Sequence, residues 1–120
     1  MASNKPLRVG PIALTNAAAD LLNPPGTTGG VNAAGSPYAI VRHIRVVNKT
    51  GAGVTVSLFI GATGASAAGT EFAWSGTTVP ANSFLDWYGV LRLDPNTFLT
   101  GLASANTSLT IDIEGELGIG

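Results

Sequence analysis

Two runs of strand-forming residues, 38–48 and 53–60, constrain the fold of this chain more than any other feature. Both are rich in β-branched and other apolar side chains, and residues 48–53, where one run ends and the next begins, read Asn-Lys-Thr-Gly-Ala-Gly. Asn and Gly are the residues that accept the positive φ angles of a tight turn, so the pattern predicts a β-hairpin. Neither run has the residue spacing of a reaction centre, which favours a structural or binding role.

Short strands separated by turns continue to the C-terminus. The predicted strands are residues 38–48, 53–60, 71–75, 83–92, 97–103 and 107–116, with Gly-, Pro- and Asn-containing breakers between them. In the last strand Leu109, Ile111 and Ile113 alternate with polar residues, which indicates one dry face. The residues predicted to lie in the core are Ile44, Val46, Val56, Leu58, Leu109 and Ile111. The spacing predicts an all-β fold, an antiparallel β-sandwich or jelly-roll-like domain over residues 37–120.

Residues 1–36 differ in character and are expected to form an extended N-terminal arm and a Gly/Pro-rich loop. The apolar run of the arm is interrupted by Gly-Pro, and Pro in a strand is confined to sheet edges. Such a segment can add a strand to a neighbouring chain, and the predicted partner contacts are Leu7, Arg8, Val9, Ile12 and Leu14. The alternative is an edge strand of the chain's own sandwich. Residues 16–22 are expected to form a short helix with Asn16 as its N-cap.

The composition favours a protein whose surface is covered by neighbours. Only 11% of the residues are charged, 45% are hydrophobic, and 16 of 120 are Gly. An average soluble domain carries about 25% charged residues, and charge keeps soluble proteins apart. We therefore expect a homo-oligomer, and a trimer would match a local symmetry axis of a larger assembly.

The charge and cysteine counts argue against several other classes. The net charge is −1 and the six basic residues are scattered, so no cluster can neutralise many phosphates and no nucleic-acid partner is expected. The chain has no Cys, hence no disulfide framework and no thiolate metal site. No apolar run approaches the roughly 18 residues of a membrane span, and the N-terminus lacks the apolar region of a signal peptide.

The search for chemistry gives weak candidates. The one histidine, His43, lies in a predicted strand and is expected to be a hydrogen-bonded structural residue, since no Gly-x-Ser-x-Gly elbow accompanies it. Asp112, Glu114 and Glu116 share one strand face and could chelate calcium, although the pattern favours a solvated face of the closing strand. Glycines in the segment 61–70 have phosphate-loop spacing, but Thr70 stands where Lys is required. No catalytic residue, metal ligand or cofactor is predicted.

Three aromatic residues form the remaining candidate site. Trp74, Trp87 and Tyr88 could build a platform on which a sugar ring stacks, as in carbohydrate-binding modules. Aromatic side chains of a small sandwich also fill the core or an interface. Both interpretations are open at the level of sequence.

Five segments span about residues 38–116: Ile-Val-Arg-His-Ile-Arg-Val-Val-Asn at 40–48 and the segments 54–70, 79–88, 99–104 and 109–115. In these segments the chain resembles small structural proteins of tailed-bacteriophage virions. The resemblance implies a β-sandwich that assembles on a capsid or tail, made in the host cytoplasm and located in the virion. The partners it implies are the major capsid protein or other virion proteins, and it supplies no catalytic residues.

The resemblance and the composition together predict a capsid decoration or cement protein that stabilises the phage head by binding across capsid subunits. A tail, neck or fibre-base protein is the first alternative. A carbohydrate-binding module is the second, and a small hydrolase is the third. Fold class alone cannot choose among them.

Overall fold

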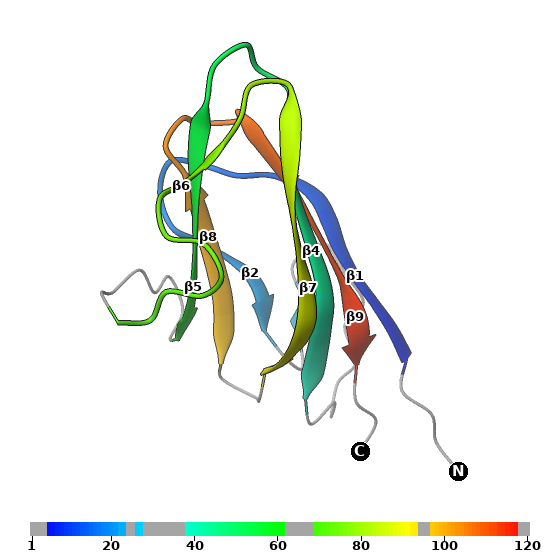
Figure 1. Ribbon diagram of the computed structural model, residues 1–120. Helices are drawn as coiled ribbons and strands as arrows, with labels where there is room; N and C mark the ends of the chain where they lie inside the picture. The colour runs from blue at the N-terminus through cyan, green and yellow to red at the C-terminus, as the bar shows by residue number, and fades with distance from the viewer. Residues whose placement is uncertain (1–4, 24–25, 28–37, 62–68, 94–96, 118–120) are drawn as a thin grey trace.

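The computed structural model of the chain describes residues 5–23, 26–27, 38–61, 69–93 and 97–117. These residues form two antiparallel β-sheets packed face to face (Figure 1). The all-β sandwich predicted from the sequence is therefore confirmed.

The first sheet has four strands and the second has five. In spatial order the first contains β1 (Lys5–Ala13), β9 (Leu109–Leu117), β4 (Ala39–Asn48) and β7 (Ser83–Leu93). The second contains β3 (Gly26–Thr27), β2 (Ala19–Asn23), β8 (Phe98–Ala103), β5 (Val54–Gly61) and β6 (Thr77–Val79). The chain switches sheets repeatedly, so strands distant in the sequence become neighbours, as β1 and β9 do.

The core lies between the two sheets and is made by alternate residues of the facing strands. In β4, Ile44 and Val46 are fully buried while Arg45 between them faces outward. All the predicted core residues are buried, which confirms the period-two interpretation: Ile44, Val46, Val56, Leu58, Leu109 and Ile111. The strands of the N-terminal segment add further buried side chains, among them Leu21 and Leu22.

The predicted hairpin at residues 48–53 is wrong. Strand β4 pairs with β7 and β9 in the first sheet, whereas β5 pairs with β6 and β8 in the second. The turn does form, but it carries the chain from one sheet to the other. Turn chemistry fixes where the chain reverses, and the burial of both apolar runs on the same core decides which strands pair.

The side chain of Asn48 holds this connection together. Its Nδ2 donates to the carbonyl oxygens of Ala52, at 2.8 Å, and Val79, at 3.0 Å, while its Oδ1 accepts from the backbone N–H and the hydroxyl of Thr50. The residue is fully buried, and these bonds engage both of its donor hydrogens and its acceptor. Because Val79 lies in β6, Asn48 links the end of the first sheet to the second.

The N-terminal arm is not a free docking segment in this structure. Lys5–Ala13 forms β1, which pairs with β9 along its length, so the structure has the alternative in which the arm joins its own sandwich. Leu7, Val9 and Leu14 are buried in the core and Ile12 packs against it. Of the five predicted partner contacts only Arg8 is exposed. Burying these apolar side chains stabilises the strand by roughly 1.5–3 kcal/mol each, which explains the correction.

Two smaller predictions also need correction. Residues 16–22 form no helix; Ala19–Asn23 is strand β2, paired with β8. A helix of under two turns forms too few hydrogen bonds to offset the free-energy cost of nucleation, whereas pairing with β8 gives these residues hydrogen bonds along the strand.

The predicted strand 71–75 is reduced to isolated bridges, because Ala73 has a positive φ of 62° that breaks the extended run. The short strand β6 follows it instead. Most of the predicted loop 23–37 lies outside the described residues.

Replacing Ile111 by Ala should lower the free energy of unfolding by about 2–5 kcal/mol, because the side chain is fully buried in the core. The measurement is a urea titration followed by tryptophan fluorescence. The matched control is Val47→Ala on the outward side of β4, which should cost less than about 1 kcal/mol. Equal losses for the two variants would contradict the assignment of inner and outer faces.

Replacing Asn48 by Ala should cost at least about 2 kcal/mol, since it removes the buried donor to the carbonyl of Val79 and the acceptor for Thr50. Asn48→Asp should also be destabilising, because it keeps the acceptor for Thr50 but loses the two donor hydrogens. Thermal melts of both variants test this against Asn106→Ala, an exposed asparagine whose loss should change stability by under about 0.5 kcal/mol. A neutral Asn48→Ala would show that the connection between the sheets does not depend on this side chain.

Candidate binding surface

The outward side of strands β4 and β7 gathers the polar and aromatic side chains that the core does not use. The strands are in register, so His43 lies opposite Tyr88, Arg45 opposite Asp86 and Val47 opposite Phe84. The alternate pairs, such as Ile44 with Trp87, face the core. We call the outward group the β4–β7 outer face; it consists of His43, Arg45, Val47, Phe84, Asp86, Tyr88 and Val90.

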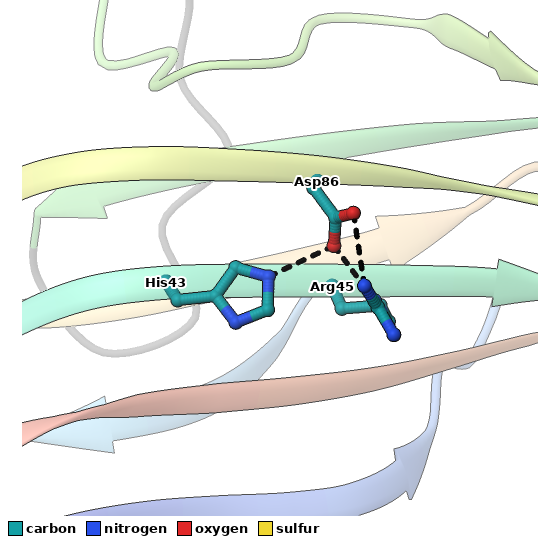
Figure 2. A network of polar contacts seen from close by, with 3 residues as sticks. All are labelled: His43, Arg45 and Asp86. Carbon is teal, nitrogen blue, oxygen red and sulfur yellow. Dashed lines mark hydrogen bonds and ion pairs between the residues drawn. The ribbon is translucent and has the colours of Figure 1, made fainter.

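Asp86 is the centre of a polar network that joins the two strands. Arg45 donates from Nε to Oδ1 at 2.7 Å and from Nη2 to Oδ2 at 3.1 Å, a bidentate pair. His43 Nε2 lies 2.8 Å from the same Oδ1 (Figure 2). The Asp86 side chain is only 16% exposed, so its charge needs these partners. The network fixes the spacing of β4 and β7 at this point.

The electrostatics follow from these bonds. The hydrogen bonds from Arg45 are the main cause that lowers the pKa of Asp86 to about 2, against partial burial of the carboxylate, which acts in the opposite direction. The hydrogen bond with His43 lowers the pKa further. In turn the bond to Asp86 raises the pKa of Arg45. Asp86 is therefore ionised over the whole range in which proteins ordinarily work.

Large hydrophobic side chains stand exposed around this network. Tyr88 is 68% exposed and Val90 69% exposed, with Phe84 at 50% and Val47 at 38%. The Tyr88 ring stacks on the His43 ring with a centroid distance of 4.5 Å, and the Arg45 guanidinium lies 4.7 Å from the centroid of Phe84. These contacts hold two aromatic rings in fixed positions on the surface. A rigid, partly apolar surface of this kind is typical of an interaction site.

Two of the three acidic residues on β9, Asp112 and Glu116, lie near basic side chains, and Glu114 is exposed. Glu116 accepts from Nε of Arg42 at 2.6 Å, and Asp112 lies 3.9 Å from Arg8. Asp112 and Glu116 are four residues apart on one strand, about 13 Å, whereas calcium ligands lie about 2.5 Å from the ion. Within the described ranges no group of three His, Cys, Asp or Glu residues could hold a metal ion.

The predicted aromatic platform is not formed. Trp87 points toward the core side, where its ring contacts Phe72 edge-on at 5.0 Å, and Trp74 also packs against the core. Tyr88, next to Trp87 in the strand, points to the opposite face. Neighbouring residues of a strand cannot present their rings to one ligand on one face. Of the three predicted aromatics, only Tyr88 belongs to the outer face.

His43 and Asp86 are hydrogen-bonded to each other as two members of a catalytic triad are, but the residues around them make the pair part of a link between β4 and β7. Arg45 occupies both carboxylate oxygens of Asp86, and Tyr88 covers one face of the imidazole. In a triad the aspartate orients the histidine toward a nucleophile and is not shared with an arginine. The expectation that His43 is a hydrogen-bonded strand residue agrees with its contacts.

Phe84, Val90 and the partners of His43 were not predicted from the sequence. The signal was present, because the alternation of residues 83–93 puts Phe84, Tyr88 and Val90 on one side of a strand. It could not show that this side faces outward, since the other side carries apolar residues as well. The segment 62–68, with the phosphate-loop spacing, lies outside the described residues.

No protein-family model matches this chain, and no curated protein matches its sequence. Among the described residues there is no helix long and apolar enough to cross a membrane. The geometry of the outer face therefore carries the functional argument.

Because of this network, the free energy of unfolding should depend on pH in the acid range. The unfolded chain should protonate Asp86 near the ordinary value of 3.8, and the folded chain only near a pKa of about 2. The stabilisation is thus complete above about pH 4 and is lost as the pH falls toward 2. We expect Asp86→Asn to lower the melting temperature at neutral pH and to reduce its decline in acid.

Melting curves between neutral pH and pH 2 test this for the wild type, Asp86→Asn, Arg45→Gln and the double variant. Since the main contact is between these two side chains, the second substitution should add little to the first. Fully additive losses, or an unchanged acid response in Asp86→Asn, would show that the pair does not lower the pKa of Asp86.

Proposed function

We propose that this protein is a non-enzymatic structural protein of a tailed-bacteriophage virion, a capsid decoration or cement protein. In this role it binds across neighbouring subunits of the major capsid protein and stabilises the phage head. It is made in the host cytoplasm and acts in the assembled particle. It uses no cofactor, and neither nucleic acid nor a membrane is among its partners.

The observation that carries the proposal is the β4–β7 outer face. It presents four exposed hydrophobic side chains on a sheet whose strands are cross-linked by Asp86. A surface that is rigid before binding loses little conformational entropy on binding, which favours a permanent assembly contact. Aromatic and Arg side chains, both present here, are the residues enriched at the centres of protein interfaces.

The sequence supports the virion assignment independently of this face. The resemblance to phage structural proteins covers about residues 38–116, which include strands β4 to β9. The low charge content suits a protein that is covered on assembly. A position in the tail, neck or fibre base is the alternative within the same class. The carbohydrate-binding alternative loses its predicted platform, because Trp87 and Tyr88 face opposite ways.

The mechanism is binding without turnover. A protein that binds only the assembled shell stabilises it by mass action, by an amount that grows with its free concentration relative to the dissociation constant. Each bound copy would bury the outer face across a boundary between subunits. Dissociation of a subunit would then also require the loss of these contacts.

The proposal predicts that Tyr88→Ser and Phe84→Ser weaken binding to phage heads that lack the protein. Each change removes an exposed aromatic side chain, and truncation of an interface hot spot typically costs about 2 kcal/mol or more, roughly thirtyfold in affinity. Co-sedimentation of purified protein with the heads measures the binding. The matched control is Thr78→Ala, an exposed change on β6 in the other sheet, which should bind as the wild type does.

Copy number separates the two virion positions. A decoration protein should be present in numbers comparable to the major capsid protein on a stained gel of purified particles, and a neck or tail protein far below it. If the protein does not bind heads, or if Tyr88→Ser and Phe84→Ser bind normally while keeping the wild-type melting temperature, the proposed docking surface is wrong.

A further inference from the structure

The two sheets have four edges, and three of them are poor templates for pairing with another chain. Strands β3 and β6 are only two and three residues long. Strand β1 contains two prolines, exposed Arg8 and a register shift between Val9 and Ile12. Very short strands, prolines, charges and bulges are the devices by which proteins protect sheet edges.

Strand β7 is the fourth edge. Its pairing with β4 shifts register between Tyr88 and Leu91 and its Arg92 is exposed, but it has neither the prolines nor the short length of the other edges. It is the longest strand, Ser83–Leu93, and among the described strands it pairs only with β4. It contains no Pro and no Lys, and its acidic side chain, Asp86, is bonded to Arg45 and His43 of β4. Three of the four large exposed hydrophobics of the described chain lie on it. An edge this long and apolar in a sheet whose other edge is protected indicates a pairing surface.

The sequence of β7 is complementary to itself about Gly89. Two antiparallel copies that cross at Gly89 place Tyr88 of each opposite Val90 of the other. The same register places Asp86 opposite Arg92 and Trp87 opposite Leu91. An aromatic residue opposite a β-branched one is a favourable cross-strand combination, whereas Asp86 already has Arg45 on both of its oxygens and would add only a weak attraction to Arg92. With one Asp and one Arg, the strand has no net charge that would repel a copy of itself.

Gly89 suits the centre of such a pair. It is exposed, and a Cβ at this position would lie 2.8 Å from the Trp87 ring of its own strand, so the structure accommodates only glycine without rearrangement. Gly89 also lies where the pairing of β7 with β4 shifts register, and a glycine inside a strand marks either such a bulge or a place where another backbone approaches closely. At the crossing point two glycines would face each other with no side chain between them.

We infer that β7 pairs with β7 of a second copy, antiparallel and centred on Gly89, so that two four-stranded sheets join into one. The interface is symmetric and closes as a two-fold dimer. This goes beyond head binding, because it concerns the free protein in solution. It also specifies a two-fold dimer for the homo-oligomer expected from the sequence, for which a trimer was one plausible form.

The test uses charge at Val90, which is 69% exposed and lies diagonally across the two-fold axis from its own copy. Sedimentation equilibrium of the wild type should give twice the 12.1 kDa monomer mass. Val90→Lys and Val90→Glu should each raise the dissociation constant of the dimer about tenfold or more. The two-fold axis brings the two copies of residue 90 close together, so each variant places two like charges near each other. An equimolar mixture of the two variants should recover the dimer as a mixed species.

The matched control is Val47→Lys, the same kind of change on the same face but one strand in from the edge. Val47→Lys should leave a dimer formed by edge-to-edge pairing of β7 intact. The same change would disrupt a dimer in which the outer faces of the two sheets pack against each other. All variants should keep the wild-type circular dichroism spectrum and melting temperature when monomeric. A wild-type monomer at high concentration, a trimer indifferent to Val90, or no recovery on mixing would overturn the inference. None of these results depends on whether the protein binds heads.

Discussion

The structure depends on the two different faces of strand β4. Lying between β9 and β7, it directs Ile44 and Val46 into the core and His43 and Arg45 outward. Shifting its register by one residue would expose the core side chains and bury two basic ones, at a cost that a domain of this size cannot meet. The register that protects the core is thus the one that brings Arg45 opposite Asp86. The binding surface follows from the packing of the core.

The end of β4 shows why a polar residue can be as structurally specific as an apolar one. Asn48 is buried with its hydrogen-bonding groups engaged, and its partners lie in both the connection and β6. An apolar residue there would fill the space but would remove the buried hydrogen bond to the carbonyl of Val79. The connection between the sheets is therefore determined by hydrogen-bond geometry, while the sheets themselves are determined by burial.

The sequence predicted the class of fold and the core, because alternation in strands such as β9 can be read without knowing their partners. It did not predict which strands pair. The turn after Asn48 has hairpin chemistry, yet β4 and β5 lie in different sheets. The apolar run of β1 likewise fits a docking arm and an edge strand equally well until β9 is known to be its neighbour. The candidate surface was missed for the same reason, since Phe84, Asp86 and Tyr88 form a site only through their cross-strand partners on β4.

The polar network and the free edge of β7 are parts of one arrangement. An isolated carboxylate on an edge strand would resist the approach of another chain, because it would have to be desolvated. Arg45 and His43 bind Asp86 from β4, the neighbouring strand. Their hydrogen bonds compensate the charge of Asp86 and leave the free edge of β7 for apolar contact. The same bonds hold β7 to β4 next to the register shift between Tyr88 and Leu91. In the proposed dimer, an ion pair directed toward β4 would leave this edge open to the second copy, and the scarcity of charge elsewhere on the chain would have the same effect.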